Sequence, residues 1–174
     1  MTKPAVARWT LFAAMAWGAA NSALAADEKL LAAARAAQPA VIESLREMVL
    51  MESGSQDAAG LKSMADYLDA RLRALGASTE RSVSGIGPGE LVKGTFVGTG
   101  KRSFLLIAHM DTVYPKGILT TEPYRQEGNK LYGPGIADDK GGIAVILHSL
   151  SILRDAGWKI RNTDGQLGEY SSRF

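Results

Sequence analysis

The sequence contains no cysteine, which excludes disulfide bonds and thiolate metal ligands in any compartment. It has only two histidines, and the G-x-x-x-x-G-K-[ST] pattern of phosphate-binding loops is missing. No apolar run reaches the ~20 residues that a membrane-spanning helix requires. Any metal ion must therefore be held by histidine, aspartate and glutamate.

Residues 1–25 have the features of a secretory signal peptide. They carry two basic residues and no acidic residue, followed by an apolar stretch over 9–20 that is too short to span a bilayer. Small residues then provide a cleavage site, which we place between Ala25 and Ala26. The sequence therefore predicts a secreted or periplasmic protein.

The chain that would remain after cleavage, residues 26–174, has no excess of either charge. Both charged residues of the signal peptide are basic, so 18 basic and 18 acidic residues are left. No basic stripe suggests a nucleic-acid partner or a membrane surface. We therefore expect neither of these partners once the signal peptide is removed.

Three segments have apolar residues at helical spacing. Residues 27–51 predict one long helix or two helices joined near Pro39, and residues 61–77 predict a second amphipathic helix with Gly76 as its stop signal. A strongly apolar third helix is expected over 143–157. These helices alternate with strand-like segments.

Two strands are expected between the second and third helices, over 91–98 and 103–109. The second contains a continuous apolar run, Phe104 to Ala108, which is typical of a strand covered on both faces. The order helix, helix, strand, strand, helix predicts an α/β fold, with helices flanking a mixed, mostly parallel sheet.

His109 and Asp111 lie two positions apart at the end of this apolar run. Alternate residues of an extended chain point to the same side, and ligands of open α/β sheets bind at the carboxyl ends of the strands. A histidine can bind a metal through one ring nitrogen while a carboxylate holds the other. The alternative is a partly buried histidine beside a turn aspartate.

Asp138 and Asp139 follow glycines in the loop "GPGIADDKGG", just before the third helix. One aspartate would suffice to cap a helix, whereas two adjacent carboxylates suggest a nearby hard cation. A dinucleotide site is disfavoured because Asp138 stands where the third glycine of G-x-G-x-x-G belongs. His148 lies among apolar residues of the third helix and is interpreted as a packing residue.

The motifs "MESGSQDAAGL", "LLIAHMDTVYPKGI" and "YGPGIADDKGGIAVILHSL" resemble those of the bacterial glutamate carboxypeptidase (carboxypeptidase G) group of the zinc aminoacylase and carboxypeptidase family. The resemblance covers roughly residues 40–158. It implies a two-zinc hydrolase that removes a C-terminal residue from a peptide or N-acyl amino acid. It also implies that His109 ligates one zinc ion, that Asp138 bridges the two ions, and that Asp111 is the catalytic-site carboxylate that orients His109. Asp139 and Lys140 would be loop residues rather than ligands.

The last residues depart from the family pattern. In "NTDGQLG", Gly165 and Gln166 stand where the family has two glutamates, a base and a zinc ligand. Neither residue can replace a glutamate in these roles. We interpret 26–158 as the N-terminal part of a co-catalytic zinc peptidase domain and 159–174 as a divergent tail, produced by a deletion or a frameshift near Lys159.

This interpretation predicts no appreciable hydrolase activity, and the homodimer of complete family members is not expected. Two alternatives remain open. One is a non-catalytic periplasmic binding module that holds an acidic small molecule through the loop glycines and Lys140. The other is a remnant of the same fold that does not fold stably.

Overall fold

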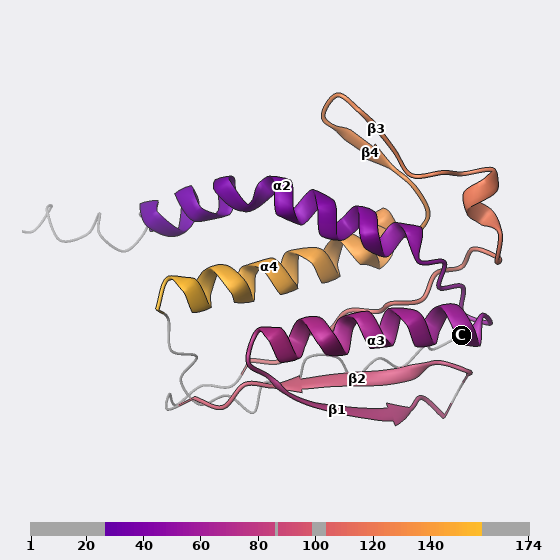
Figure 1. The fold of residues 1–174 in the computed structure, drawn as a ribbon, viewed down its shortest axis with the longest axis horizontal. Coiled ribbons are helices and arrows are strands. Elements are labelled where there is room, and N and C mark those ends of the chain that lie inside the picture. The colour runs from indigo at the N-terminus through magenta and orange to yellow at the C-terminus, as the bar shows by residue number, and fades with distance from the viewer. Residues whose placement is uncertain (1–26, 86, 99–103, 158–174) are drawn as a thin grey trace, which may run out of the picture.

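The computed structural model describes residues 27–85, 87–98 and 104–157. The predicted signal peptide and the divergent tail lie outside these residues. Within them the elements follow one another as α2 (Glu28–Leu50), α3 (Ala58–Ala74), β1 (Ser78–Val83), β2 (Glu90–Thr95), η1 (Ile118–Thr120), β3 (Arg125–Glu127), β4 (Lys130–Tyr132), η2 (Ile136–Lys140) and α4 (Gly141–Asp155) (Figure 1). None of the helices in this described part is long and apolar enough to cross a membrane.

Helix α2 is a single helix with Pro39 inside it, which decides between the two forms expected for this segment. Its first turn is capped by Asp27, whose carboxylate accepts hydrogen bonds from the backbone N–H groups of Lys29 and Leu30, at 2.9 and 3.2 Å. The buried residues lie in the second half of the helix, between 44 and 49. That half is therefore the part that faces the core.

Helix α3 begins three residues before the sequence-based expectation. The carboxylate of Asp57 accepts a hydrogen bond from the backbone N–H of Gly60 at 3.2 Å, so the cap lies before the segment that the sequence predicts as helical. The helix ends as expected before Gly76, whose φ of 97° lies in the left-handed region that glycine tolerates best.

Strands β1 and β2 form an antiparallel hairpin in which Ser78 pairs with Thr95 and Val83 with Glu90. Strand β2 corresponds to the first expected strand. Strand β1 was not predicted, because most of its residues are exposed and its sequence, STERSV, shows little hydrophobic character. A second antiparallel hairpin, β3 and β4, projects from the body of the molecule (Figure 1).

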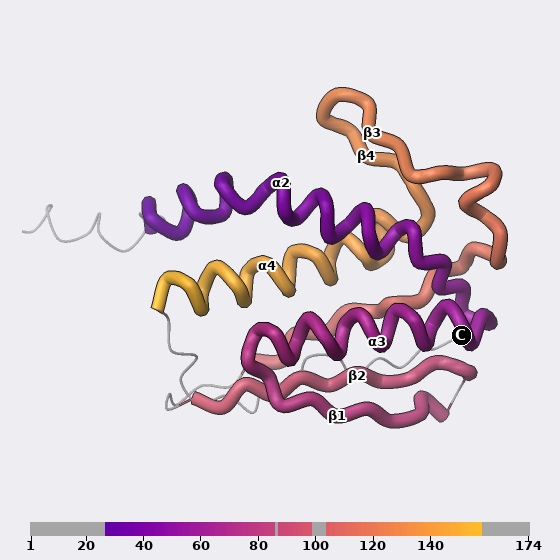
Figure 2. Tube along the Cα trace, in the orientation of Figure 1, coloured from indigo at the N-terminus to yellow at the C-terminus, as the bar shows by residue number. Residues whose placement is uncertain are grey.

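The helices and the first hairpin enclose one core. Helix α2 packs against α4, and α3 packs against β2, so that the helices lie on one side of the hairpin (Figures 1 and 2). The centre of the core is formed by buried apolar residues of all these elements and of the chain before Thr112: Leu45, Met48, Val49, Leu61, Met64, Ala65, Leu72, Val92, Met110, Ile143, Ala144 and Leu147.

The expectation of a buried strand over 103–109 is wrong for its described residues. Residues 104–109 belong to neither hairpin, Leu106 is the one residue among them that forms a β-bridge, and the side chains from Phe104 to Ile107 are between 38% and 65% exposed. A strand forms only where a neighbour accepts and donates its backbone hydrogen bonds, and no described segment forms such a ladder with 104–109.

The predicted α/β class agrees with this mixture of helices and small sheets. The predicted predominance of parallel pairing is not seen, because both hairpins in the described part of the chain are antiparallel. One isolated parallel bridge joins Gly54 to Thr112.

Candidate metal centre

His109 and Asp138, which the sequence singled out as metal ligands, face each other. The Nε2 atom of His109 lies 2.8 Å from Oδ1 of Asp138. His109 comes from the extended segment before Thr112, and Asp138 comes from the turn η2 that leads into α4. The peptide bond between Asp138 and Asp139 is cis. Two residues 29 positions apart in the chain thus meet at one point.

Asp111 holds the other side of the imidazole ring. Nδ1 of His109 lies 3.2 Å from Oδ1 of Asp111 and 3.2 Å from its backbone oxygen. Asp111 is only 4% exposed, so its carboxylate acts on the ring with little competition from water. A neutral histidine with its proton on Nδ1 would direct the lone pair of Nε2 toward Asp138.

The surroundings of His109 raise its pKa above the ordinary value. Partial burial acts to lower the pKa, but the hydrogen bond with Asp138 and the negative charge of Asp111 together outweigh it. Both effects favour a positive charge at the ring. The same two carboxylates would favour a metal cation beside Nε2.

Ser55 is a member of this site that the sequence did not reveal. Its hydroxyl donates a hydrogen bond to Oδ2 of Asp111 at 2.6 Å. The sequence alone favours a simple connector over Ser53–Ser55, because the segment lacks the glycine-flanked turn and the histidine that a nucleophile needs. The only available signal was that the segment belongs to one of the motifs that carry the family resemblance.

Lys140 is almost fully buried, with 1% of its surface exposed. Its ammonium donates a hydrogen bond to the backbone oxygen of Met51 at 2.9 Å. Burial lowers the pKa of Lys140 to about 8, although the nearby charge of Glu52 acts in the opposite direction. A cation in this position ties the turn before α4 to the end of α2, and it does not present a charge to a ligand in solvent.

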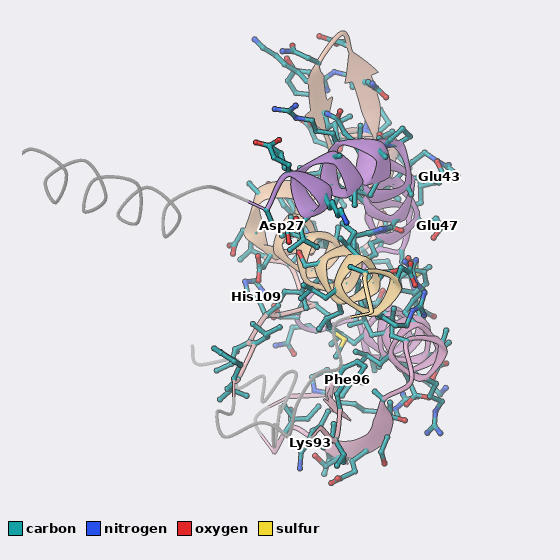
Figure 3. The ribbon with its side chains drawn as sticks, turned by 90° about the vertical axis from the view of Figure 1, so that its left-hand side faces the viewer. Asp27, Glu43, Glu47, Lys93, Phe96 and His109 are labelled. Carbon is teal, nitrogen blue, oxygen red and sulfur yellow. The ribbon has the colours of Figure 1, made fainter. Side chains whose placement is uncertain are left out.

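His148 lies apart from the His109 site. Its Nε2 atom is 2.9 Å from the hydroxyl oxygen of Ser44 on α2, and partial burial together with the charge of Arg71 lowers its pKa. The carboxylates of Glu43 and Glu47 on α2 point to the opposite side of the molecule from His109 (Figure 3). The second histidine and these two acids therefore do not complete the candidate centre.

The donor types at His109 and Asp138 fit a zinc ion, which prefers imidazole nitrogen and carboxylate oxygen in a site without cysteine. A zinc ion takes about four ligands. Residues 27–85, 87–98 and 104–157 contain no group of three or more histidine and acidic side chains arranged to hold a metal. If His109 and Asp138 are ligands, as the sequence predicts, the described residues would supply two of about four, fewer than a closed zinc site needs.

Comparison with known proteins also points to a peptidase family. Residues 105–163 match the model of "Peptidase family M20/M25/M40". This chain is a relative of the M20 peptidases. The match confirms the resemblance seen in the motifs.

Two relatives show how far the likeness extends. Carboxypeptidase G2 from Pseudomonas sp. (strain RS-16) is 43% identical over 182 aligned residues, which cover 98% of this chain and 44% of that protein. Succinyl-diaminopimelate desuccinylase from Novosphingobium aromaticivorans is 36% identical over 99 residues, covering 53% of this chain and 26% of the relative. The chain thus spans less than half the length of these M20 relatives.

The fold is shared with a solved M20-type structure. The crystal structure of human carnosine dipeptidase 1 matches with a TM-score of 0.69 at 19% identity, over 81% of this chain and 34% of that chain. At this identity the match shows the fold alone. It confirms that the helices and small sheets belong to an α/β domain, here represented in part.

Proposed function

We propose that this chain carries part of the catalytic domain of a zinc-dependent peptidase of the carboxypeptidase type. The main support is the approach of His109 Nε2 to within 2.8 Å of Asp138 Oδ1, with Asp111 on the far side of the ring. The similarity to Carboxypeptidase G2 over nearly the whole chain supports the same class. The substrate would be a peptide or an N-acyl amino acid, cleaved at its C-terminal amide bond.

In this proposal each residue has one task. His109 and Asp138 hold zinc, and Asp111 keeps the imidazole in the orientation and tautomer that leave Nε2 free to bind it. When bound, zinc polarises the scissile carbonyl and lowers the pKa of its bound water to about 7. In the two-zinc form that the resemblance implies, Asp138 would be a ligand of both ions.

We further propose that residues 26–174 by themselves have no appreciable hydrolase activity. The two described ligands, His109 and Asp138, are fewer than a zinc ion needs. Gly165 and Gln166, which fall outside the described residues, replace the glutamates that would act as base and ligand. These two positions would carry the family's proton acceptor, and neither glycine nor glutamine can accept the proton of the attacking water.

Zinc binding tests the proposed site directly. Residues 26–174 are titrated with zinc in competition with a chromophoric chelator, alongside His109→Ala and His148→Gln. Because His109 supplies the nitrogen ligand, we expect its loss to weaken binding at least tenfold. His148→Gln is the matched control, since its amide can still accept the Ser44 hydroxyl. Equal affinity of the wild-type chain and His109→Ala would rule out the site.

The activity proposal has its own assay. The purified chain is incubated with N-acyl-glutamate substrates and added zinc, and released glutamate is measured. We expect no turnover above the buffer rate. Turnover that a chelator abolishes would show that the chain is an active enzyme.

Export is a separate proposal, which rests on residues 1–25. Expression of the full sequence in a bacterium, followed by N-terminal sequencing of the periplasmic fraction, should give a chain that begins at Ala26. Recovery of the uncleaved chain from the cytoplasm alone would contradict it.

A further inference from the structure

The short segment Ser53–Ser55 lies directly against the chain that follows His109. Its backbone forms a parallel bridge, in which the N–H of Thr112 donates to the oxygen of Ser53 at 2.8 Å and the N–H of Ser55 donates to the oxygen of Thr112 at 2.9 Å. Gly54 is required for this approach, since a Cβ atom there would overlap the backbone oxygen of Tyr114. The two segments are therefore held in a fixed register.

The two serine hydroxyls of this segment have different targets. The Ser53 hydroxyl donates to the backbone oxygen of Met110 at 2.7 Å. The Ser55 hydroxyl lies 2.6 Å from Oδ2 of Asp111 and 3.1 Å from the backbone oxygen of Thr112. It has one proton, and the shorter approach to the charged oxygen identifies Asp111 as its main acceptor.

Both oxygens of the Asp111 carboxylate are consequently engaged, Oδ1 with His109 and Oδ2 with Ser55. This second bond restricts rotation of the carboxylate about its Cβ–Cγ bond. Asp138 competes for the ring proton from the other side, since its Oδ1 lies closer to Nε2, at 2.8 Å, than Asp111 lies to Nδ1. A rotated Asp111 would leave Nδ1 with only the backbone oxygen of Asp111, at 3.2 Å, as an acceptor, and this would shift the proton toward Nε2, where it blocks metal binding.

We propose that Ser55 is a positioning residue that fixes the Asp111 carboxylate, so that neutral His109 carries its proton on Nδ1 and offers Nε2 as a metal ligand. The metal-binding consequence rests on the function proposed above. The effect on the tautomer does not, because it concerns the metal-free chain.

The tautomer can be read from the imidazole ¹⁵N chemical shifts of the metal-free chain, at a pH where His109 is neutral. Only two histidines are present, so His148 serves as an internal reference. In Ser55→Ala we expect the ratio of the Nδ1–H to the Nε2–H form of His109 to fall at least threefold. Ser53→Ala is the matched control, because its hydroxyl contacts backbone and not Asp111.

Two variants of equal shape remove the effect of packing. Ser55→Thr keeps the hydroxyl and Ser55→Val replaces it with a methyl group, so we expect the first to retain the wild-type ratio and the second to behave like Ser55→Ala. This pair also serves if Ser55→Ala fails to fold. An unchanged ratio in Ser55→Val, or an equal fall in Ser53→Ala, would overturn the proposal.

Zinc affinity gives a second measurement. Loss of a group that contacts a metal-bound histidine typically weakens binding 10–100-fold. Ser55 acts one residue further out, so we expect a loss of roughly three- to tenfold in Ser55→Ala and none in Ser55→Thr. If the wild-type chain binds no zinc, the proposed function fails, and the ¹⁵N shifts still decide the role of Ser55.

Discussion

Replacing Lys140 with methionine should remove much of the change in unfolding free energy that the wild-type chain shows when the pH is raised above 7. Lys140 is 1% exposed, and its burial lowers the pKa from 10.5 in the unfolded chain to about 8 in the folded protein. The folded state therefore holds this proton less tightly than the unfolded state does. Protonation of Lys140 thus favours unfolding.

The size and sign follow from these two values. Below pH 8 both states are protonated, and the shift costs the folded protein about 3 kcal/mol. As the pH rises from 8 toward 10.5, the folded state loses its proton first, so stability increases with pH. Between pH 7 and pH 9.5 the wild-type chain should gain about 2 kcal/mol from this residue.

Methionine at this position removes the titration but also removes the donor to the Met51 oxygen. An unsatisfied buried carbonyl costs about 1–3 kcal/mol. The two effects nearly offset each other at pH 7, where Lys140→Met should be equal in stability to the wild-type chain or up to about 2 kcal/mol more stable. At pH 9.5 about 1 kcal/mol of the charging cost remains, so the variant should be equal in stability to the wild-type chain or up to about 2 kcal/mol less stable.

The assay is urea unfolding of metal-free protein at pH 7, 8.5 and 9.5. The quantity of interest is the difference in unfolding free energy between wild type and variant, because other titrating groups cancel in it. Lys62→Met is the control, since Lys62 is exposed on α3 and pairs with Asp66. A Lys140→Met difference that stays constant from pH 7 to pH 9.5 would refute the reasoning.

Two further predictions concern the packing that supports the site. Leu147→Ala changes a core position of α4 that is 3% exposed, and it should lower the unfolding free energy by about 2–5 kcal/mol. Val145→Ala, at a position that is 59% exposed, should lower it far less. Urea unfolding compares the two variants, and equal losses would contradict the assigned core. Gly54→Ala should cost about 1–3 kcal/mol, because the added Cβ meets the Tyr114 backbone oxygen, and a melting temperature equal to that of wild type would argue against the close approach.

The helices could be predicted from the sequence because their signals are local. Apolar periodicity located α2 and α4 to within about two residues, and Gly76 marked the end of α3. The start of α3 was missed because Asp57 lies among small and polar residues that also suit a loop. Strand β1 was missed because its pairing with β2, rather than a hydrophobic pattern of its own, makes it a strand.

The strand expected over 103–109 failed for the opposite reason. The segment is apolar, but an apolar composition shows only that a segment is suited to burial. Whether it is covered depends on neighbours that are distant in the sequence, and the described residues form no ladder with it. The same limit applies to Ser55, whose partner Asp111 lies 56 residues further along the chain.

The contacts of the described residues explain how His109 approaches Asp138. Exposure changes along the segment, from 58% at Ile107 to 5% at Met110. The buried part is the part that Ser53 and Ser55 bind through hydrogen bonds to Met110 and Thr112, so these contacts directly after His109 help to position it. Asp138 is held independently, through the buried Lys140 and its bond to Met51 at the end of α2. Since Met51 and Ser53 are only two residues apart, both halves of the candidate centre are tied to the same short stretch of chain after α2.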